Sequence, residues 1–404
     1  MNVEPLTSDA LKTRASAEAG KLRVALFSGN YNYVVDGALL AQNKLVEHLL
    51  KRGHEVLVFS PTSKSPAFDH VGELVPIPSF ALPGSRSEYR LGLGLFGAAK
   101  ARLDAFRPTL IHLAAPDITG FQSVNYGQKN GIPVVASFHT RFDTYPRYYG
   151  AAWAEKYLTN YMRHVYGRCE HVYPPAESMK EELVRVGIGR EVRLWARGVD
   201  HEVFTPKRRD LEWRRSLGIL DGDLLVSFVG RIVLEKGIDV FAEAINAARA
   251  KAGNVKAIVV GDGPEADRFS KALPDSVFTG FLAGEQLARA YASADVFLNP
   301  SITESFGNVT LEAMACGSPV IGANASGSVS IIVDNQNGLL VDPQEGAAGF
   351  SEAVVRVAND RELLKTLGAE AHKTGLTYNW ETILDRLIND YRDAIAGYRT
   401  ADAA

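Results

Sequence analysis

Short apolar runs alternate along the chain with stretches in which apolar residues recur every three or four positions. Residues 21–28 (KLRVALFS) and 54–60 (HEVLVFS) have the composition of buried strands, and residues 39–50 between them have helical spacing. Further strands are expected at 109–113, 133–138 and 171–174, and helices at 120–130 and from Ser178 as N-cap. This alternation predicts a parallel α/β sheet whose ligand lies beyond the carboxyl ends of its strands.

A second series with the same alternation follows residues 193–200 (RLWARGVD). Its first strand is expected at 224–229 (LLVSFV) and its last at 338–341, which predicts a second doubly wound domain. Between them the pattern predicts strands at 256–260, 277–281, 295–299 and 320–323, and helices at 238–250, 265–272, 284–293, 306–316 and 326–333.

The length of 404 residues exceeds that of one typical core, so two domains are expected. We place a loose extension at 1–20, an N-terminal domain at 21–198 and a second domain at 199–378. A closing helix within 379–404 is expected to pack back on the first domain. A ligand of two parts would then lie in the central cleft that the two domains face.

The composition is that of a soluble globular protein, with 46% hydrophobic and 23% charged residues. No apolar run has the roughly 18 residues of a membrane span, and the start does not resemble a secretory signal. Two cysteines, Cys169 and Cys316, provide neither a disulfide framework nor a metal site, which fits a reducing cytoplasm.

The net charge of −3 is divided unequally along the chain. Residues 21–200 carry 22 Lys and Arg against 16 Asp and Glu, whereas residues 201–378 carry 17 against 23. This asymmetry suggests different partners for the two halves, but the excess is too small and scattered to indicate nucleic acid.

The stretch 294–320 contains the most informative chemistry. Glu304 lies in a polar loop after a short strand, and Glu312 lies inside the following helix, so both can face one cleft. Between them, Ser305, Phe306, Gly307 and Asn308 supply amides at a helix N-terminus, which favours phosphate binding. An ordinary strand-loop-helix with two solvated glutamates is the alternative.

Two cations follow the first strand of the second domain. Arg231 and Lys236 stand five apart in a loop bounded by glycines, and together with the helix amides they predict a diphosphate site. Either cation alone could be a solvated surface residue.

His139, at the end of the strand 133–138, faces the crevice side of the sheet or is a packed structural histidine. The aromatic stretch 142–168 is interpreted mainly as a helix packed on the sheet.

These residues resemble the retaining GT-B glycosyltransferases of sequence family four. The motifs are Gly-Arg-x4-Lys at 230–236, Gly-Asp-Gly-Pro at 261–264, Glu-x7-Glu at 304–312 and Gly-Val-Asp at 198–200. Ser-Phe-His-Thr at 137–140, residues 145–148 and residues 193–200 are most similar to the branch of sulfoquinovosyl, mannosyl and glucuronosyl transferases that act on diacylglycerol-type lipids. The resemblance spans residues 21–398 and implies an N-terminal acceptor-binding domain and a C-terminal nucleotide-sugar-binding domain.

The resemblance also implies roles for individual residues. Arg231 and Lys236 would bind the donor diphosphate, Glu304 the hydroxyls of the donor sugar and Glu312 the ribose. His139 would lie at the reacting side of the sugar, with Arg231, Lys236 and Glu304 as the other catalytic residues. The remaining donor-binding positions implied are Gly37, Gly230, Gly263, Phe281, Leu282, Ser305, Phe306, Gly307, Asn308 and Val309. Acceptor or sugar-acid candidates are Arg141, Tyr145, Arg147 and Arg197.

We therefore expect a retaining enzyme that moves a sugar from a nucleotide-sugar, most readily a UDP-sugar, to a membrane-lipid hydroxyl. No cofactor or metal is expected, because cations and amides replace it and no Asp-x-Asp motif is present. The family often has an acid in the segment 326–330, where this chain has Ser-Gly-Ser-Val-Ser, so the donor stays open. GDP-mannose-dependent transfer, a soluble acceptor, an epimerase and a non-catalytic sugar-nucleotide-binding partner are the alternatives.

A basic segment in the first domain predicts contact with an anionic membrane. Residues 83–108 carry five cations, Arg86, Arg90, Lys100, Arg102 and Arg107, with leucines and Phe96 between them. An amphipathic basic helix of this kind lies in the headgroup region. The expected location is therefore peripheral on the cytoplasmic face of the membrane, and a surface helix packed on the domain core is the alternative.

Overall fold

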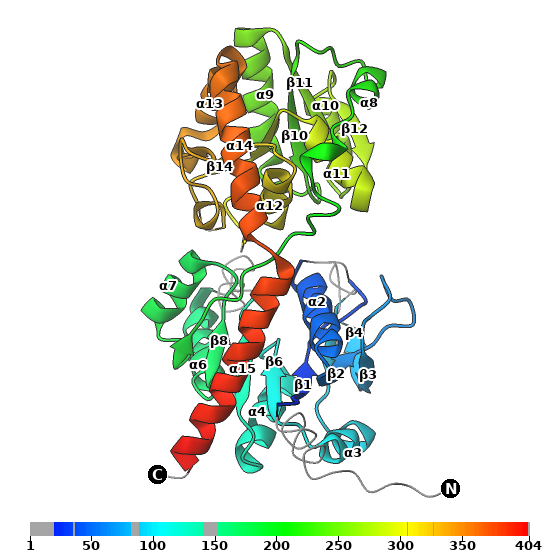
Figure 1. The fold of residues 1–404 in the computed structure, drawn as a ribbon, viewed down its shortest axis with the longest axis vertical. Coiled ribbons are helices and arrows are strands. Elements are labelled where there is room, and N and C mark those ends of the chain that lie inside the picture. Colours follow the sequence, from blue (N-terminus) through cyan, green and yellow to red (C-terminus); the bar gives the residue numbers. More distant parts are fainter. Residues whose placement is uncertain are drawn as a thin grey trace, which may run out of the picture. The chain divides into compact units, whose positions relative to one another are not determined.

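The computed structural model describes residues 20–34, 37–81, 89–139, 152–304, 306–325 and 327–402. The chain divides into two compact units, each of which has its own sheet (Figure 1). The first comprises residues 1–174, 180–195 and 384–404, and the second comprises residues 175–179 and 196–383. The expected α/β class with two Rossmann-like parallel-sheet domains is confirmed.

Seven parallel strands form the sheet of the first unit, in the order β3-β2-β1-β6-β7-β8-β9. Their bounds are β1 Arg23–Phe27, β2 Glu55–Pro61, β3 Glu73–Ile77, β6 Leu110–Leu113, β7 Val134–Ser137, β8 His171–Tyr173 and β9 Glu191–Val192. The central strands β6 and β7 are buried along their length, which is why they are mostly apolar and do not alternate with exposed polar residues. The strand order reverses between β1 and β6, which makes this the switch point of the sheet.

Helices connect these strands. They are α2 Gly37–Lys51, α3 Gly97–Phe106, α4 Ile118–Lys129, α6 Glu155–Tyr166 and α7 Glu177–Val186, with the 3-10 turn η3 Ala152–Ala154 before α6. Asp117 caps α4, because its carboxylate accepts a hydrogen bond from the amide of Gly120. A separate antiparallel hairpin pairs β4 Ser79–Ala81 with β5 Arg90–Gly92.

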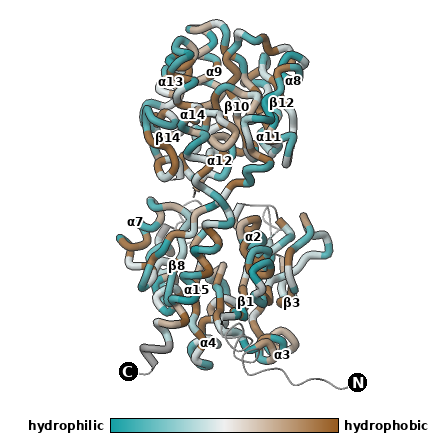
Figure 2. The backbone as a smooth tube through the Cα atoms, in the orientation of Figure 1, coloured by the Kyte–Doolittle hydropathy of each residue, from teal (hydrophilic) through white to brown (hydrophobic). Residues whose placement is uncertain are grey.

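The final helix, α15 Trp380–Asp402, begins in the second unit and belongs to the first from Leu384 onward. Its hydrophobic and hydrophilic residues alternate along the helix (Figure 2), and Leu384, Leu387 and Tyr391 are buried. Asp385 accepts hydrogen bonds from Arg52 Nε at 2.9 Å and pairs with His48 Nε2 at 2.7 Å, both at the end of α2. These contacts fix α15 as part of the first unit.

Six parallel strands form the sheet of the second unit, in the order β12-β11-β10-β13-β14-β15. Their bounds are β10 Leu224–Val229, β11 Val255–Val260, β12 Val277–Gly280, β13 Val296–Asn299, β14 Val320–Ala323 and β15 Gly338–Val341. The order reverses between β10 and β13. The helices are α8 Leu211–Ser216, α9 Ile238–Ala252, α10 Ala266–Ala272, α11 Gly284–Ser293, α12 Asn308–Ala315, α13 Gly346–Asn359 and α14 Arg361–Thr377.

The core of the second unit is a sheet packed against α9 and α13. Phe228 of β10 meets Phe241 of α9 edge to face at 5.4 Å between ring centroids, and Phe269 at 5.2 Å. All three rings are buried, so the core gains both apolar burial and favourable ring geometry.

Three local expectations were wrong. Residues 326–333 do not form a helix: the described part contains only the 3-10 turn η6 Ser328–Ser330, and serine is a weak helix former. Ser178 lies inside α7 rather than capping it. The stretch 83–108 is not one amphipathic helix, because its described part divides into β5 and the ten-residue α3, interrupted by Gly94 at φ 127°.

Candidate functional site

Two loops meet at the switch point of the second sheet, where β10 and β13 end. The loop after β10 contains the 3-10 turn η5 Leu234–Lys236. The hydroxyls of Ser301 and Thr303, in the loop after β13, both donate to the Glu235 carbonyl at 3.3 Å. The two loops are thereby held in register at the edge where open α/β sheets bind their ligands.

Lys236 and Glu304 form an ion pair across these loops. The distance from Lys236 Nζ to Glu304 Oε1 is 2.5 Å, and the Glu304 side chain is 13% exposed. Lys236 is the last residue of η5, and Gly237 follows it at φ 70°, a conformation that glycine adopts without cost. Two residues expected at the site are therefore in direct contact.

Arg231 lies earlier in the same loop, directly after Gly230. Its side chain is exposed, and it forms no ion pair with any residue among those the structure describes. The loop therefore offers one paired and one unpaired cation to an anionic ligand. A guanidinium can bind phosphate through two parallel hydrogen bonds, and an ammonium binds it as a point charge.

Helix α12 begins beside Glu304. Gly307 is its N-cap at φ 95° and ψ 58°, and the amides of the first turn lack acceptors within the helix. The Phe306 side chain is buried and meets Tyr378 at 6.0 Å between ring centroids, so the ring anchors the loop while its backbone stays at the helix start. Asn308 and Val309, also expected at the site, are the first two residues of the helix.

Glu312 lies one turn further along α12 and has a different environment. Its Oε2 accepts a hydrogen bond from the buried Tyr291 hydroxyl at 3.3 Å. Burial raises the pKa of Glu312 to about 7, because removing a carboxylate from water disfavours the charged form. Glu304 and Glu312 thus differ in partner: one pairs with a cation and the other with a phenol.

The glycines of the two motifs explain how closely the neighbouring loops pack. A Cβ added at Gly261 would lie 2.0 Å from the carbonyl oxygen of Gly230, and one added at Gly263 would lie 2.3 Å from that of Ile232. The amide of Ile232 also donates to the Asp262 carbonyl at 2.9 Å. Gly261 and Gly263 therefore permit backbone contact between the loops after β10 and β11.

Phe281 and Leu282 follow β12, at the same edge of the sheet. The Phe281 side chain is 74% exposed, and Leu282 packs partly against the cluster that includes Ile258. An exposed aromatic ring at this edge is available to stack on a planar group.

Two further expected residues, His139 and Gly37, belong to the first unit. His139 follows β7, and its ring meets Trp195 edge-on at 5.6 Å between ring centroids. Gly37 is the first residue of α2, after the switch-point strand β1. Arg197, at the start of the second unit, is buried. Ser305, Arg141, Tyr145 and Arg147 lie outside the described residues.

Sequence reasoning missed three supporting residues. Ser301 and Thr303 bind the Glu235 carbonyl, and Gly327 lies against Glu304, where an added Cβ would be 2.9 Å from the Glu304 Cβ. A hydroxyl or a glycine in a loop is too common a signal to mark such a position. The described ranges contain no helix long and apolar enough to cross a membrane, and no group of three or more metal-ligating side chains.

Comparison with known proteins adds the family. The model described as "Glycosyltransferase Family 4" matches residues 43–203, and "Glycosyl transferases group 1" matches residues 223–360. A GDP-mannose-dependent alpha-mannosyltransferase of Mycobacterium tuberculosis is 33% identical over 389 residues, which is 95% of this chain and 99% of that protein.

Two further relatives carry other names. The sulfoquinovosyl transferase SQD2 of Arabidopsis thaliana is 29% identical over 92% of this chain and 74% of its own length. An alpha-monoglucosyldiacylglycerol synthase of Streptococcus pneumoniae is 28% identical over 84% of this chain and 80% of its own length. Among solved structures, the sucrose-phosphate synthase of Thermosynechococcus elongatus superposes with a TM-score of 0.72 at 21% identity. The match covers 93% of this chain and 100% of that one, and it shows a shared fold.

Proposed function

This chain belongs to glycosyltransferase family 4, and we propose that it moves a sugar from a UDP-sugar to a hydroxyl of a membrane lipid. Transfer with retention of configuration and without a metal ion is part of the proposal. The observation that supports it most is the Lys236–Glu304 ion pair. Lys236 lies in the loop that carries Arg231, and Glu304 lies just before the first turn of α12.

We assign the donor groups to the residues of this edge as follows. Arg231 and Lys236 bind the diphosphate together with the amides of Gly307 and Asn308. Glu304 then accepts hydrogen bonds from the sugar hydroxyls, and the ribose hydroxyls donate to Glu312. Phe281 and Leu282 line the base. The arrangement suits a dianionic leaving group, because cations and a helix N-terminus favour negative charge.

The proposed step forms one bond and breaks one. The bond from the sugar C1 to the diphosphate oxygen breaks, and the acceptor oxygen bonds to C1 on the same face. The acceptor proton passes to the departing phosphate oxygen. Arg231 and Lys236 lower the barrier by stabilising the charge that develops on the diphosphate, which is usually the largest catalytic term.

A lipid acceptor is supported by relatives and by one exposed surface of the first unit. Trp153 of η3 is 75% exposed and Tyr157 of α6 is 70% exposed, and their rings meet edge-on at 6.4 Å between centroids. Tyr161, one turn further, is also exposed. Tryptophan and tyrosine are enriched where a protein meets the membrane interface. We therefore propose peripheral binding to the cytoplasmic membrane face through this unit.

A second candidate is transfer from GDP-mannose, which is favoured by the mannosyltransferase relative at 33% identity. The two candidates differ in the base and sugar but require the same diphosphate site. Thermal-shift measurements with UDP, GDP and their sugars would separate them, since a ligand raises the melting temperature according to its occupancy.

The decisive experiment is transfer of radiolabelled sugar to diacylglycerol in vesicles, with and without EDTA. The proposal expects glycolipid formation from a UDP-sugar and no effect of EDTA. Formation from GDP-mannose alone would favour the second candidate. Nucleotide binding without transfer to lipid or soluble acceptors would indicate a non-catalytic protein, and loss of activity in EDTA would refute metal independence.

A further inference from the structure

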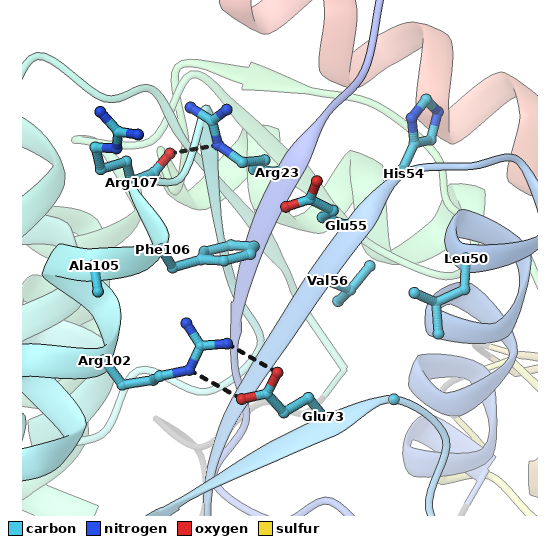
Figure 3. A pocket seen from close by; sticks show the side chains of 11 residues that line it. Arg23, Leu50, His54, Glu55, Val56, Glu73, Arg102, Ala105, Phe106 and Arg107 are labelled. Atoms are coloured by element: carbon cyan, nitrogen blue, oxygen red, sulfur yellow. Dashed lines mark hydrogen bonds and ion pairs between the residues drawn. The ribbon is translucent and has the colours of Figure 1, made fainter. Parts of the chain in front are cut away.

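The first unit has a cavity of about 540 Å³ at the amino edge of its sheet (Figure 3). Arg23, Glu55 and Glu73, the first residues of β1, β2 and β3, line it, and the end of α3 closes one side. Ligands of open α/β sheets bind at the opposite, carboxyl edge. The cavity is therefore separate from the family's reaction site, although its volume is that of a small-molecule site.

The charges of this cavity do not cancel. Glu73 binds Arg102 through two hydrogen bonds of 2.9 Å, and Glu55 pairs with Lys21 at 2.6 Å. Both lining carboxylates therefore already have a cation. Arg23 and Arg107 remain, and neither pairs with an acidic side chain among the residues that the structure describes. In Figure 3 both guanidinium groups lie at the same end of the cavity.

The two arginines are held together by the backbone. Arg23 Nε donates to the Arg107 carbonyl at 2.8 Å, which orients the Arg23 guanidinium and leaves its two terminal nitrogens as donors. Phe106 provides apolar lining next to this polar end, and Val56 and Leu50 extend the apolar lining away from it (Figure 3). The cavity thus combines the oriented guanidinium of Arg23 and the exposed side chain of Arg107 with an apolar wall.

Arg107 occupies a backbone conformation that normally belongs to glycine. It ends α3 at φ 48° and ψ 65°, the left-handed region in which helices most often place glycine. A non-glycine residue there costs on the order of 1 kcal/mol. A strained position that keeps an unpaired arginine on a cavity points to a use for that side chain.

We propose that this cavity binds a phosphate-bearing ligand through Arg23 and Arg107. Two guanidiniums offer the parallel donors that phosphate accepts, and the apolar wall receives the part of the ligand next to the phosphate. The phosphate belongs either to an anionic lipid headgroup or to a free phosphorylated metabolite. This site is independent of the donor reaction proposed above.

The test uses the full chain and four single variants: Arg23→Gln, Arg107→Gln, Arg107→Gly and, as a matched control, Arg190→Gln at an exposed position outside the cavity. Melting temperatures are measured with rising inorganic phosphate or glycerol 3-phosphate at constant ionic strength. The donor site is the same in all five proteins, so differences between them report on the cavity alone.

The proposal expects phosphate to raise the melting temperatures of the wild type and Arg190→Gln. In Arg23→Gln, Arg107→Gln and Arg107→Gly, most of the part of this rise that comes from binding in the cavity should be lost. Arg107→Gly is expected to melt at a higher temperature than wild type without phosphate, because the backbone strain is relieved. Equal phosphate responses in all five proteins would overturn the proposal. The same holds if the variants at Arg23 and Arg107 only lower the melting temperature, as for a purely structural role at the end of α3.

Vesicle sedimentation identifies the source of the phosphate. Phosphatidylcholine vesicles with and without phosphatidylglycerol are compared for wild type, Arg107→Gly and Arg190→Gln. A several-fold loss of binding to the anionic vesicles in Arg107→Gly alone assigns a lipid headgroup. Unchanged vesicle binding together with a lost glycerol 3-phosphate response assigns a free phosphorylated ligand.

Discussion

The carboxyl edge of the second sheet and the amino edge of the first both present cations to a ligand, but in different states. At the edge of the second sheet Lys236 is already paired with Glu304 and Arg231 is not, whereas at the edge of the first sheet neither Arg23 nor Arg107 has a carboxylate partner in the described part of the chain. A paired cation must exchange its partner when an anion binds, so ligand binding at that edge also frees a carboxylate. An unpaired cation offers its full charge and changes nothing else.

The two edges also differ in how their backbone conformation relates to the residue present. Gly261 has no side chain because the Gly230 carbonyl occupies the space, and Arg107 has one although its conformation favours glycine. The edge of the second sheet thus permits close backbone packing, whereas the amino edge of the first sheet keeps a side chain in a backbone conformation that favours glycine.

Gly261→Ala should lower the free energy of unfolding by about 3 kcal/mol, since the new methyl group would overlap the Gly230 carbonyl and the local φ of 137° disfavours alanine. Urea unfolding measures the effect. Gly222→Ala is the control, because no atom lies within 4 Å of a Cβ placed there. Similar stability of the two variants would contradict the packing argument.

Lys236→Ala and Arg231→Ala should each reduce kcat/KM for transfer at least tenfold while the circular dichroism spectrum and melting temperature stay close to wild type. Each loses a charge-assisted contact to the diphosphate, which is worth about 1.5–3 kcal/mol. Lys251→Ala, at an exposed position of α9, is the control. Wild-type turnover in either site variant would refute the diphosphate assignment.

Glu304→Gln and Glu312→Gln should differ in which measurement they change. If Glu312 binds ribose, its amide variant weakens binding of the free nucleoside diphosphate several-fold. Glu304→Gln should spare that affinity and lower the rate of transfer, because its proposed contact is with the sugar. Calorimetric titration and initial rates measure the two effects. Equal losses of nucleotide affinity would show that the division of roles is wrong.

The affinity for the nucleoside diphosphate should rise a few-fold between pH 6 and pH 8. The Glu312 pKa of about 7 means that its carboxyl is mostly protonated at pH 6, and the ionised form is the better acceptor for ribose hydroxyls. The same raised pKa makes its contribution to folding stability fall as pH rises from the unfolded value through 7. Glu312→Gln should remove the contribution of this carboxyl to the pH dependence of affinity and of stability. The pH dependence of affinity that remains should come from titration of the nucleotide's phosphate.

Most strands of both sheets could be predicted within one or two residues. β10 is apolar except for Ser227 and β13 is apolar up to Asn299, and both are bounded by polar loops, so local composition identifies them. No element was expected over 346–377, where α13 and α14 lie, although Val354 and Val357 have helical spacing there. The prediction of a helix at 326–333 failed because a short run of serines and valines fits the start of a helix as well as a turn.

The candidate site was predictable in its residue types but not in its contacts. Arg231, Lys236, Glu304 and Glu312 stand in motifs, and the structure brings Lys236 and Glu304 together. The partner of Glu312, Tyr291, belongs to a different helix, α11, and only packing of α11 against α12 makes the pair. Likewise, the requirement for glycine at 261 arises from a carbonyl thirty-one positions away, which no local pattern encodes.

The course of α15 has a consequence for how such enzymes diversify. Because residues 384–402 belong to the first unit, residues 196–383 form a continuous insert within it, and residues 175–179, up to the start of α7, belong to the same second unit. An exchange of 196–383 between relatives would replace most of the second unit in one piece and leave the Asp385 contacts to His48 and Arg52 in place. A cut before 384 would instead strip Tyr391 from the core of the other module. The second unit can therefore be exchanged without rebuilding the first, provided that α15 from Leu384 onward stays with the first unit.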